Sequence, residues 1–346
     1  MKTYKPRGRY HLMAEWEKEC AILVTMPSAL TDWAYILDKA KQQCRDLVHA
    51  LLAHGQQVIL LCNNEENIEI HPHPLLKIVS AEYNDTWTRD YGPLSVSDGN
   101  KERMLDFGFN AWGLKFAANK DNLVNLQLSE QNIFPEEYIR NCRKYILEGG
   151  SVETDGKGTL LTTSRCLCSP NRNGGLSKQE VNEAMRLYLG IEHVLWLDYG
   201  ALEGDDTDSH IDTLARMAPH DTIVYTGSSN SGDWQDQELK MMADQLKAFR
   251  TMHGELFNLV ELPLPSPVYD EDGMRLPATY ANYLVTPDHI FMPTYSQHEN
   301  DILAAQILKS VFPGHTIVGV DCRTYLHQHG SLHCATMQIP LSLLNL

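Results

Sequence analysis

Hydrophobic residues recur at helical spacing across residues 31–54, and Gly55 follows where a helix would end. The short apolar run at 58–62 comes directly after it and predicts a strand, and a polar loop then leads to a second predicted strand at 77–81. The pattern in this part of the chain therefore predicts the order helix, strand, loop, strand.

The same pattern returns near the C-terminal end. Strands are predicted at 283–285 and 290–292 around a Pro-Asp turn, followed by a helix at 301–311 and a strand at 316–320. Another helix is predicted at 235–253, where Gly254 would end it, and further strands are predicted at 104–107, 159–163 and 222–225. Helices and strands mix throughout without a long linker, so we expect one α/β domain covering residues 1–346.

Chemically distinctive residues fall at rather even intervals, namely Asp90, Glu148, His210, Asn282 and Cys334, with gaps of 58, 62, 72 and 52 residues. Such spacing fits about five similar β/α modules around an axis, each contributing one loop to a shared central site.

The composition is typical of a folded enzyme, with 43% hydrophobic and 21% charged residues among 346. The net charge of −16 disfavours nucleic acids and anionic membranes as partners, whereas it would attract small cations. Eight cysteines lack the tight spacing of a disulfide scaffold, and no export signal or membrane-spanning run is visible. We therefore expect a cytoplasmic location.

The segment 84–93 packs three charges, two aromatic rings and a Gly-Pro turn between two apolar stretches. Asp90 in this segment could receive a cationic group, although an ion pair with Arg89 that holds a surface turn explains the same pattern. Trp87 could equally be a core residue or a platform for a ligand.

The stretch 145–163 predicts a strand, a glycine-rich bend, a hairpin turn and another strand. Glu148 ends the apolar run beside Gly149 and Gly150, which permit close backbone approach. An acid at this point could line a pocket or could simply stand at an exposed strand end.

The most acidic cluster surrounds His210 and contains Asp205, Asp206, Asp208 and Asp212. If this stretch is extended, His210 and Asp212 lie on the same face. A carboxylate beside a histidine raises its basicity for proton transfer, and carboxylates also bind guanidinium groups through paired hydrogen bonds. A solvated acidic loop and a hard-cation site are the alternatives.

The stretch 321–337 holds two cysteines and three histidines, namely Cys322, Cys334, His327, His329 and His333. Zinc is one interpretation, but no Cys-x-x-Cys pair or familiar finger spacing is present. A nucleophilic Cys334, with its thiolate favoured by nearby positive charge, explains the pattern better, while a buried structural cysteine is the third possibility.

Taken together and in this order, the motifs resemble those of the agmatine deiminase and Porphyromonas-type peptidylarginine deiminase family. The resemblance runs from Met13-Ala-Glu-Trp-Glu17 almost to the C-terminus and includes Gln328-His-Gly-Ser-Leu-His-Cys334. It implies the pentein fold, a five-bladed α/β propeller of repeated ββαβ modules around a central active site. This fold agrees with the even spacing of the motifs.

The resemblance also implies a role for each candidate residue. Cys334 would be the nucleophile and His210 the general acid and base, and Glu148 would orient that histidine. Asp90 and Asp212 would clamp the guanidinium. Trp87 would flank the aliphatic stem of the substrate, and Asp206 would contact its far ammonium.

The implied reaction is hydrolysis of agmatine to N-carbamoylputrescine and ammonia through a covalent thiouronium intermediate, a step of putrescine and polyamine biosynthesis. It requires no metal or organic cofactor, and the resemblance suggests a homodimer.

Three other functions stay open at this point. The nearest is deimination of free or peptidyl arginine, whose carboxylate or peptide backbone would have to face Asp205, Asp206 and Asp208. A zinc metalloprotein would use His327, His329, His333 and Cys334. A catalytically silent binding protein should have lost at least one of the main site residues, yet Cys334, His210, Asp90 and Asp212 are all present.

Overall fold

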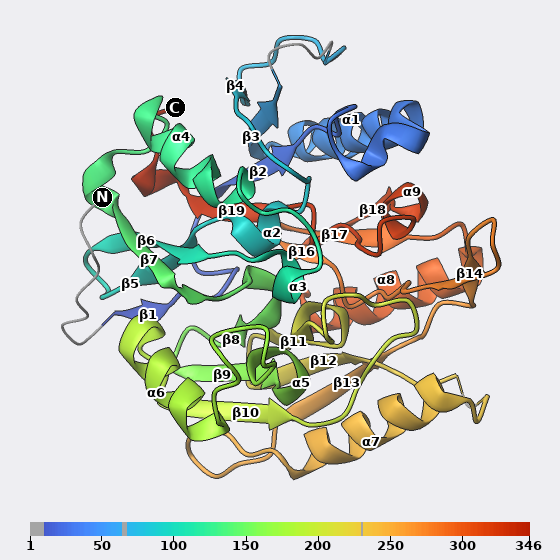
Figure 1. Cartoon of the computed structure of the whole chain (residues 1–346). Coiled ribbons are helices and arrows are strands. Elements are labelled where there is room, and N and C mark those ends of the chain that lie inside the picture. Colours follow the sequence, from blue (N-terminus) through green and yellow to red (C-terminus); the bar gives the residue numbers. More distant parts are fainter. Residues whose placement is uncertain (1–9, 64–67, 230) are drawn as a thin grey trace.

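Five small sheets of three or four strands form the framework of the described chain, residues 10–63, 68–229 and 231–346 of this computed structural model (Figure 1). In each of the five, a middle strand pairs antiparallel with one neighbour and parallel with the other. Helical segments connect the middle strand to its parallel partner in every case, as parallel pairing requires a crossover. One local architecture therefore recurs along the chain.

The five sheets in spatial order are β19 (Met337–Pro340), β2 (Cys20–Thr25), β3 (Gln57–Cys62) and β4 (Leu76–Ser80); β1 (His11–Leu12), β5 (Leu94–Ser97), β6 (Glu102–Gly108) and β7 (Ile139–Ile146); β10 (His193–Leu197), β9 (Thr159–Thr163) and β8 (Glu153–Thr154); β11 (Ala215–Ala218), β12 (Thr222–Thr226) and β13 (Asn258–Leu262); and β16 (Leu284–Val285), β17 (His289–Thr294) and β18 (Thr316–Asp321). A separate hairpin pairs β14 (Val268–Tyr269) with β15 (Arg275–Leu276).

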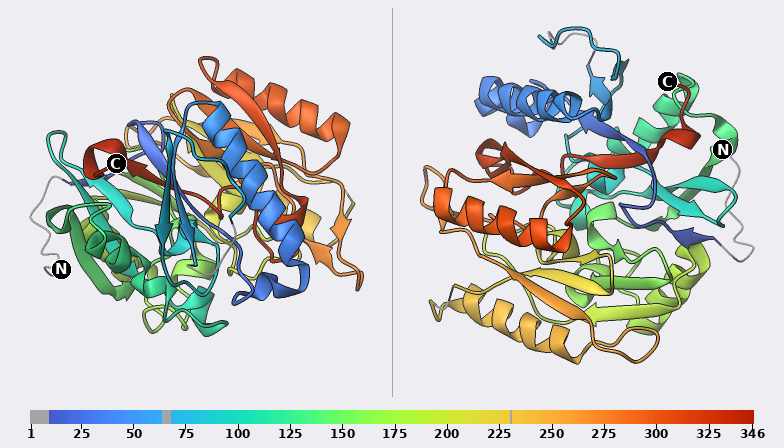
Figure 2. Two further views of the ribbon diagram at one scale, coloured as in Figure 1. Left: turned by 90° about the horizontal axis from the view of Figure 1, so that it is seen from above. Right: turned by 180° about the vertical axis from the view of Figure 1, so that it is seen from behind.

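The longer helices lie on the outside of the molecule, whereas the short helices α2 and α3 lie near its centre (Figures 1 and 2). The outer helices are α1 (Leu37–Ala53), α4 (Val124–Glu130), α6 (Lys178–Leu189), α7 (Trp234–Ala248) and α8 (His298–Val311). The short segments are η1 (Asp32–Ile36), α2 (Thr88–Tyr91), α3 (Ala111–Leu114), η2 (Asp121–Leu123), η3 (Glu136–Tyr138), η4 (Gly149–Ser151), α5 (Ser164–Leu167), η5 (Ile211–Thr213), α9 (Arg323–Leu326) and η6 (Leu341–Leu343).

The first predicted helix is confirmed as η1 followed by α1. Cys44, Leu47 and Leu51 of its apolar stripe are fully buried, and Gly55 follows the helix with a φ of 74°. This left-handed conformation is favourable for glycine, so the residue ends the helix as predicted. The strands predicted at 58–62 and 77–81 correspond to β3 and β4.

The other predicted elements are confirmed as β6, β9, β12, β16, β17, α8 and β18, with shifts of a few residues at their ends. The predicted end of the helix at 235–253 is wrong, because α7 stops at Ala248. Phe249 is extended, with φ −67° and ψ 148°, and a bridge between Arg250 and Leu256 follows. Gly254, with a φ of 83°, belongs to that later turn.

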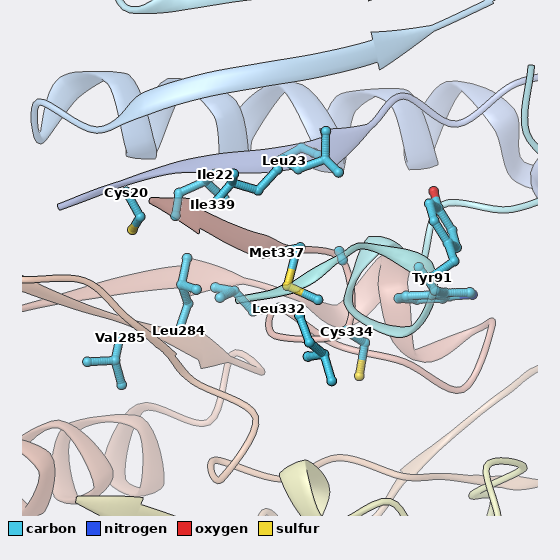
Figure 3. Close-up of a cluster of buried hydrophobic side chains, with 14 of the residues drawn as sticks. Cys20, Ile22, Leu23, Tyr91, Leu284, Val285, Leu332, Cys334, Met337 and Ile339 are labelled. Atoms are coloured by element: carbon cyan, nitrogen blue, oxygen red, sulfur yellow. The ribbon is translucent and has the colours of Figure 1, made fainter. Parts of the chain in front are cut away.

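A large cluster of buried apolar side chains extends across the sheets. Figure 3 shows the part beside β2 and β19, where Cys334 lies next to Leu332 and Met337 and its sulfur points away from the strand that carries Ile22 and Leu23. The nucleophile candidate therefore stands at the boundary between this core and the centre of the molecule. Within the described residues, we find no helix with the length and apolar character needed to span a membrane.

Candidate active site

The candidate residues lie in loops or short helices that adjoin strands of different sheets. Asp90 lies in α2, Glu148 between β7 and η4, His210 just before η5, and Cys334 just before β19. The extended conformation in which His210 and Asp212 would share a face is not present. Both the backbone N–H and the hydroxyl of Thr213 donate to the His210 carbonyl, at 3.4 and 2.9 Å, and close a 3₁₀ turn instead.

Three of these side chains converge on Gly150. Its backbone N–H donates to Asp90 Oδ1 at 2.9 Å, and the same oxygen lies 3.6 Å from His210 Nδ1. A Cβ atom at this position would lie 2.7 Å from His210 Nδ1, 2.8 Å from Asp90 Oδ1 and 3.0 Å from Asp212 Oδ2. The close packing therefore depends on the missing side chain of this glycine.

Cys334 lies beside two acceptors, with its Sγ 3.4 Å from Asn282 Oδ1 and 3.8 Å from Asp212 Oδ2. Burial, together with the negative charges of Asp212 and Asp90, raises the pKa of this thiol well above its ordinary value. The expectation that nearby positive charge favours the thiolate is therefore wrong for the free protein. The neighbouring His333 turns its ring toward Asp212 instead, with Nδ1 at 2.8 Å from Asp212 Oδ2.

His210 is buried and keeps a proton. Burial disfavours the charged ring, but the Asp90 carboxylate, the Cys166 thiol and the Glu148 carboxylate raise the pKa of His210 to about 10. The ligand atoms of His210, Cys166 and Glu148 lie within 4.8 Å of one another. His210 Nε2 itself has no hydrogen-bond partner among the described residues.

Glu148 is held by an arginine that the sequence analysis missed. Arg172 Nε donates to both carboxylate oxygens, at 2.8 and 2.9 Å, and neither side chain is exposed to solvent. Arg172 Nη1 also donates to Asp208 at 2.5 Å. Because Arg172 lies in a loop without hydrophobic periodicity, no local pattern marked it. The predicted role of Glu148 in orienting His210 stays a prediction, since its hydrogen bonds go to Arg172.

Asp212 and Asp90, the two carboxylates that act on the Cys334 thiol, differ in how readily they ionise. Burial opposes ionisation of Asp212, but the hydrogen bond and charge of His333 lower its pKa below the ordinary value. Burial raises the pKa of Asp90, and the charge of Asp212 adds to this effect although His210 opposes it. Asp212 is therefore the more firmly ionised of the two.

A pocket of about 440 Å³, which includes its open mouth, reaches from Cys334 and Asp90 outward. Its remaining lining is formed by Asp32, Asp85, Trp87, Trp112, Phe116, Asp206, Thr207, Thr213, Gln328, His329 and Gly330. Cys334 and Asp90 are 7% and 4% exposed, whereas Phe116 is 48% exposed, so the cysteine lies at the closed end. The pocket combines an acidic lining with aromatic walls, which suits an elongated cation.

Trp112 is a second residue that the sequence analysis missed. Its Nε1 donates to Asp90 Oδ2 at 2.9 Å. Ala111, Trp112 and Leu114 all have positive φ, between 50° and 70°, which costs energy for residues other than glycine. This strained turn places the indole both on the carboxylate and in the pocket wall.

The four residues proposed as zinc ligands do not form one cluster. Among the described residues, the groupings able to hold a metal are Glu148 with Cys166 and His210, and Glu15 with Glu153 and His333. His329 Nδ1 instead lies 2.7 Å from the Gly204 carbonyl, and His333 contacts carboxylates on both sides. The zinc interpretation of His327, His329, His333 and Cys334 is therefore not supported.

The fold and this arrangement agree with one family of proteins. The chain belongs to the Porphyromonas-type peptidyl-arginine deiminase family, whose model matches residues 11–340. The resemblance inferred from the motifs is thus confirmed at the level of the family.

Individual relatives in this family include agmatine deiminases. A curated protein from Shewanella sp. (strain MR-7), provisionally named an agmatine deiminase, is 32% identical over 98% of this chain and 96% of its own length. The structure of a cysteine-to-serine variant of the C. jejuni agmatine deiminase with substrate bound is 33% identical, with a TM-score of 0.87 over 97% of each chain. A structure from Porphyromonas gingivalis, provisionally described as an arginine deiminase, is 40% identical, with a TM-score of 0.89 over 97% of this chain and 100% of its own.

Proposed function

We propose that this chain hydrolyses agmatine to N-carbamoylputrescine and ammonia, with Cys334 as the nucleophile. The observation that carries the proposal is the pocket whose closed end holds Cys334 and Asp90, with Asp212 3.8 Å from the sulfur, and whose outer part holds Asp206. A thiol between carboxylates suits a guanidinium at the closed end, and a further carboxylate suits an amine at the other. Full-length relatives named agmatine deiminase support this assignment.

Binding of the guanidinium is the first step. Asp90 and Asp212 would each accept N–H groups from the planar cation and present its central carbon to Cys334. The positive charge of the bound guanidinium would offset the two carboxylates that disfavour the thiolate in the free protein. Trp87, which lines the pocket and is 4% exposed, would flank the aliphatic stem.

Chemistry then proceeds in two halves. Cys334 first loses its thiol proton to solvent as the cationic substrate binds, and the thiolate then attacks the central carbon. His210, which carries a proton, donates it to the departing nitrogen, so that the C–N bond breaks and ammonia leaves a covalent thiouronium. Neutral His210 next removes a proton from water, which adds to the same carbon. Collapse of this adduct breaks the C–S bond, passes the hydroxyl proton to the departing sulfur, releases the ureido product and restores the Cys334 thiol and the His210 imidazolium. In this scheme the Arg172-bound Glu148 helps to hold the charge of His210.

The state of the Cys334 thiol gives a pH prediction. Because its folded pKa lies well above the ordinary value of 9.0, the reactive thiolate is scarce at neutral pH and increases as the pH rises. Alkylation of Cys334 by iodoacetamide in the substrate-free protein should therefore keep accelerating through pH 9, as followed by peptide mass spectrometry. A rate that levels off near pH 7 would show a stabilised thiolate and contradict the prediction.

The acidic lining at the outer part gives a second prediction. Asp206→Asn should raise KM for agmatine about 10-fold, the cost of losing one charge-assisted contact, with little change in kcat. Burial raises the pKa of Asp206 to about 6 and the charge of Asp205 adds to this, although His329 opposes it. KM of the wild type should therefore rise as the pH falls through about 6.

Pentylguanidine, which has the guanidinium but no terminal amine, is the control substrate for this variant. Its KM should be the same for Asp206→Asn and wild type. An equal loss for both substrates would mean that the substitution distorts the pocket rather than removing an ammonium contact.

Deimination of arginine is the second candidate, because the family description and the P. gingivalis structure name that chemistry. The pocket argues against it, since the carboxyl groups of Asp32 and Asp206 in its lining would oppose the carboxylate of free arginine. Lys115 lies close to Asp206, but its Nζ donates to the Asp206 backbone carbonyl and to Asp208 Oδ1, the latter at 2.9 Å, so its hydrogen bonds already go to other acceptors. Agmatine, which lacks this carboxylate, is therefore the favoured substrate.

Several broader features belong to the same proposal. The recurrence of one pairing pattern in five sheets supports a five-bladed pentein propeller of ββαβ modules, formed as one catalytic domain over residues 1–346. We also propose that the enzyme is a cytoplasmic homodimer that serves putrescine and polyamine biosynthesis. Light scattering at several protein concentrations tests the dimer.

A further inference from the structure

Glu15 lies in the segment between β1 and β2, within the stretch 13–17 that carries part of the family resemblance but no assigned role. Its carboxylate contacts three basic side chains. Oε1 lies 2.6 Å from His333 Nε2 and 3.2 Å from Arg89 Nη1, and Oε2 lies 2.9 Å from Arg216 Nη2. The side chains of these three partners are at most 6% exposed, and that of Glu15 is 17% exposed. A surface salt bridge would not involve so much buried charge.

Two of these cations, His333 and Arg89, are tied to residues of the candidate active site. His333 precedes Cys334 and contacts Asp212 at 2.8 Å, and Arg89 precedes Asp90. The backbone N–H of Arg89 also donates to the Cys334 carbonyl at 3.1 Å. Glu15 thus joins, from outside the substrate pocket, the segments that carry the nucleophile and both carboxylates of the clamp.

The geometry of His333 defines its protonation. Its Nδ1 lies 2.8 Å from Asp212 Oδ2 and its Nε2 lies 2.6 Å from Glu15 Oε1, and a carboxylate oxygen can only accept. Arg216 Nη2 lies 3.1 Å from the same Nε2 and could donate to it if this nitrogen carried no proton. The lone pair of an unprotonated Nε2 would, however, repel the closer Glu15 Oε1 at 2.6 Å. Both ring nitrogens therefore donate, and His333 is an imidazolium.

The remaining charged and titratable groups around this ring are consistent with that state. Glu153 accepts from Arg216 Nε at 2.5 Å, and the guanidinium carbon of Arg216 lies 4.7 Å from the centre of the Tyr283 ring. Burial opposes ionisation of Glu15, but the charges of His333, Arg216 and Arg89 hold its pKa well below the ordinary value. The Glu15 carboxylate is therefore a fixed negative charge at neutral pH.

We infer that Glu15 is a positioning residue for guanidinium binding, which holds His333 as an imidazolium and thereby keeps Asp212 ionised and correctly oriented beside Cys334. This inference rests on the proposed clamp role of Asp212. Glu15 acts through its cationic partners, chiefly His333, and touches no reacting atom.

The variant Glu15→Gln tests this chain of contacts. A neutral amide should let His333 lose a proton, and Asp212, no longer held by an imidazolium, becomes easier to protonate. We expect KM for agmatine to rise about 10-fold or more and the acid limb of the kcat/KM profile to move up by about one pH unit. Glu19→Gln, the same substitution at an exposed position of the same segment, should leave both unchanged.

The result that would overturn the inference is an unshifted pH profile in folded Glu15→Gln, even if kcat falls. A purely structural role would lower the amount of folded protein without moving that limb. If the wild type does not hydrolyse agmatine, the proposed function is wrong. The protonation of His333, measured by NMR without any substrate, then tests the role of Glu15 independently.

Nitrogen-15 NMR of histidine-labelled, substrate-free protein reads the protonation of His333 directly and does not need a stable variant. At a pH of about 7.5, where ordinary imidazoles are mostly neutral, the fully protonated rings of the wild type should include those of His210 and His333. His333→Asn identifies the signal of His333, and Glu15→Gln should lose it. A wild type in which the His333 ring is not fully protonated contradicts the inference.

Discussion

Replacing Cys334 by alanine should lower kcat/KM for agmatine by at least about 10,000-fold, because covalent catalysis has no substitute once its nucleophile is gone. The sulfur lies at the closed end of the pocket, 3.8 Å from Asp212 Oδ2. The nearby thiol of Cys166 cannot take over, since it is fully buried and does not line this pocket. Formation of ammonia and of the ureido product should be measured in parallel with agmatine, free arginine and a peptidyl arginine.

Cys168→Ala provides the matched control, because Cys168 is a partly buried cysteine that does not line the pocket. It should retain the activity of the wild type. Turnover that survives in Cys334→Ala would contradict the mechanism. Turnover of peptidyl or free arginine in preference to agmatine would keep the nucleophile but replace the substrate.

Gly150→Ala should lower kcat/KM about 100-fold to 1,000-fold, because displacements of about 1 Å in a catalytic group have effects of this size. The new Cβ would lie within 3.0 Å of His210, Asp90 and Asp212 atoms, so these three side chains would have to separate. The pKa of His210 should fall as Asp90 moves away from it, and the alkaline limb of the kcat profile, which reports groups in the substrate complex, should move to lower pH.

Gly314→Ala is the corresponding control, because a Cβ there meets no atom within 4 Å and its φ is not in the left-handed range. That variant should fold and react like the wild type. If Gly150→Ala kept full activity while folded, the side chains around it would not need the close approach seen here.

Much of the fold could be predicted from local patterns. The buried stripe of α1 and the apolar runs of β3, β12 and β18 depend on nearest neighbours along the chain, so their periodicity is visible in the letters. The end of α7 could not be predicted in the same way. After Ala248 the backbone forms a bridge between Arg250 and Leu256 instead of further helical turns. The prediction that Gly254 ends the helix could not take this contact into account.

The candidate site was only partly visible in the sequence. Asp90, His210 and Cys334 stood out because unusual residues cluster around them, and the structure brings Asp90 and His210 within 3.6 Å. Arg172 and Trp112 had no such signal, because a buried ion pair and a strained turn involve partners far away in the sequence. The catalytic roles themselves stay predictions until the variants are measured.

The sequence by itself determined which chemical groups are present, the local helices and strands, and the family to which the chain belongs. Only the tertiary structure decided the charge on each group. The sequence suggested a thiolate at Cys334 from the neighbouring His333, whereas the fold turns that ring toward Asp212 and Glu15 and leaves the thiol among carboxylates. Burial and Coulomb interactions depend on distance in space, and residues adjacent in the chain can therefore have opposite electrostatic surroundings.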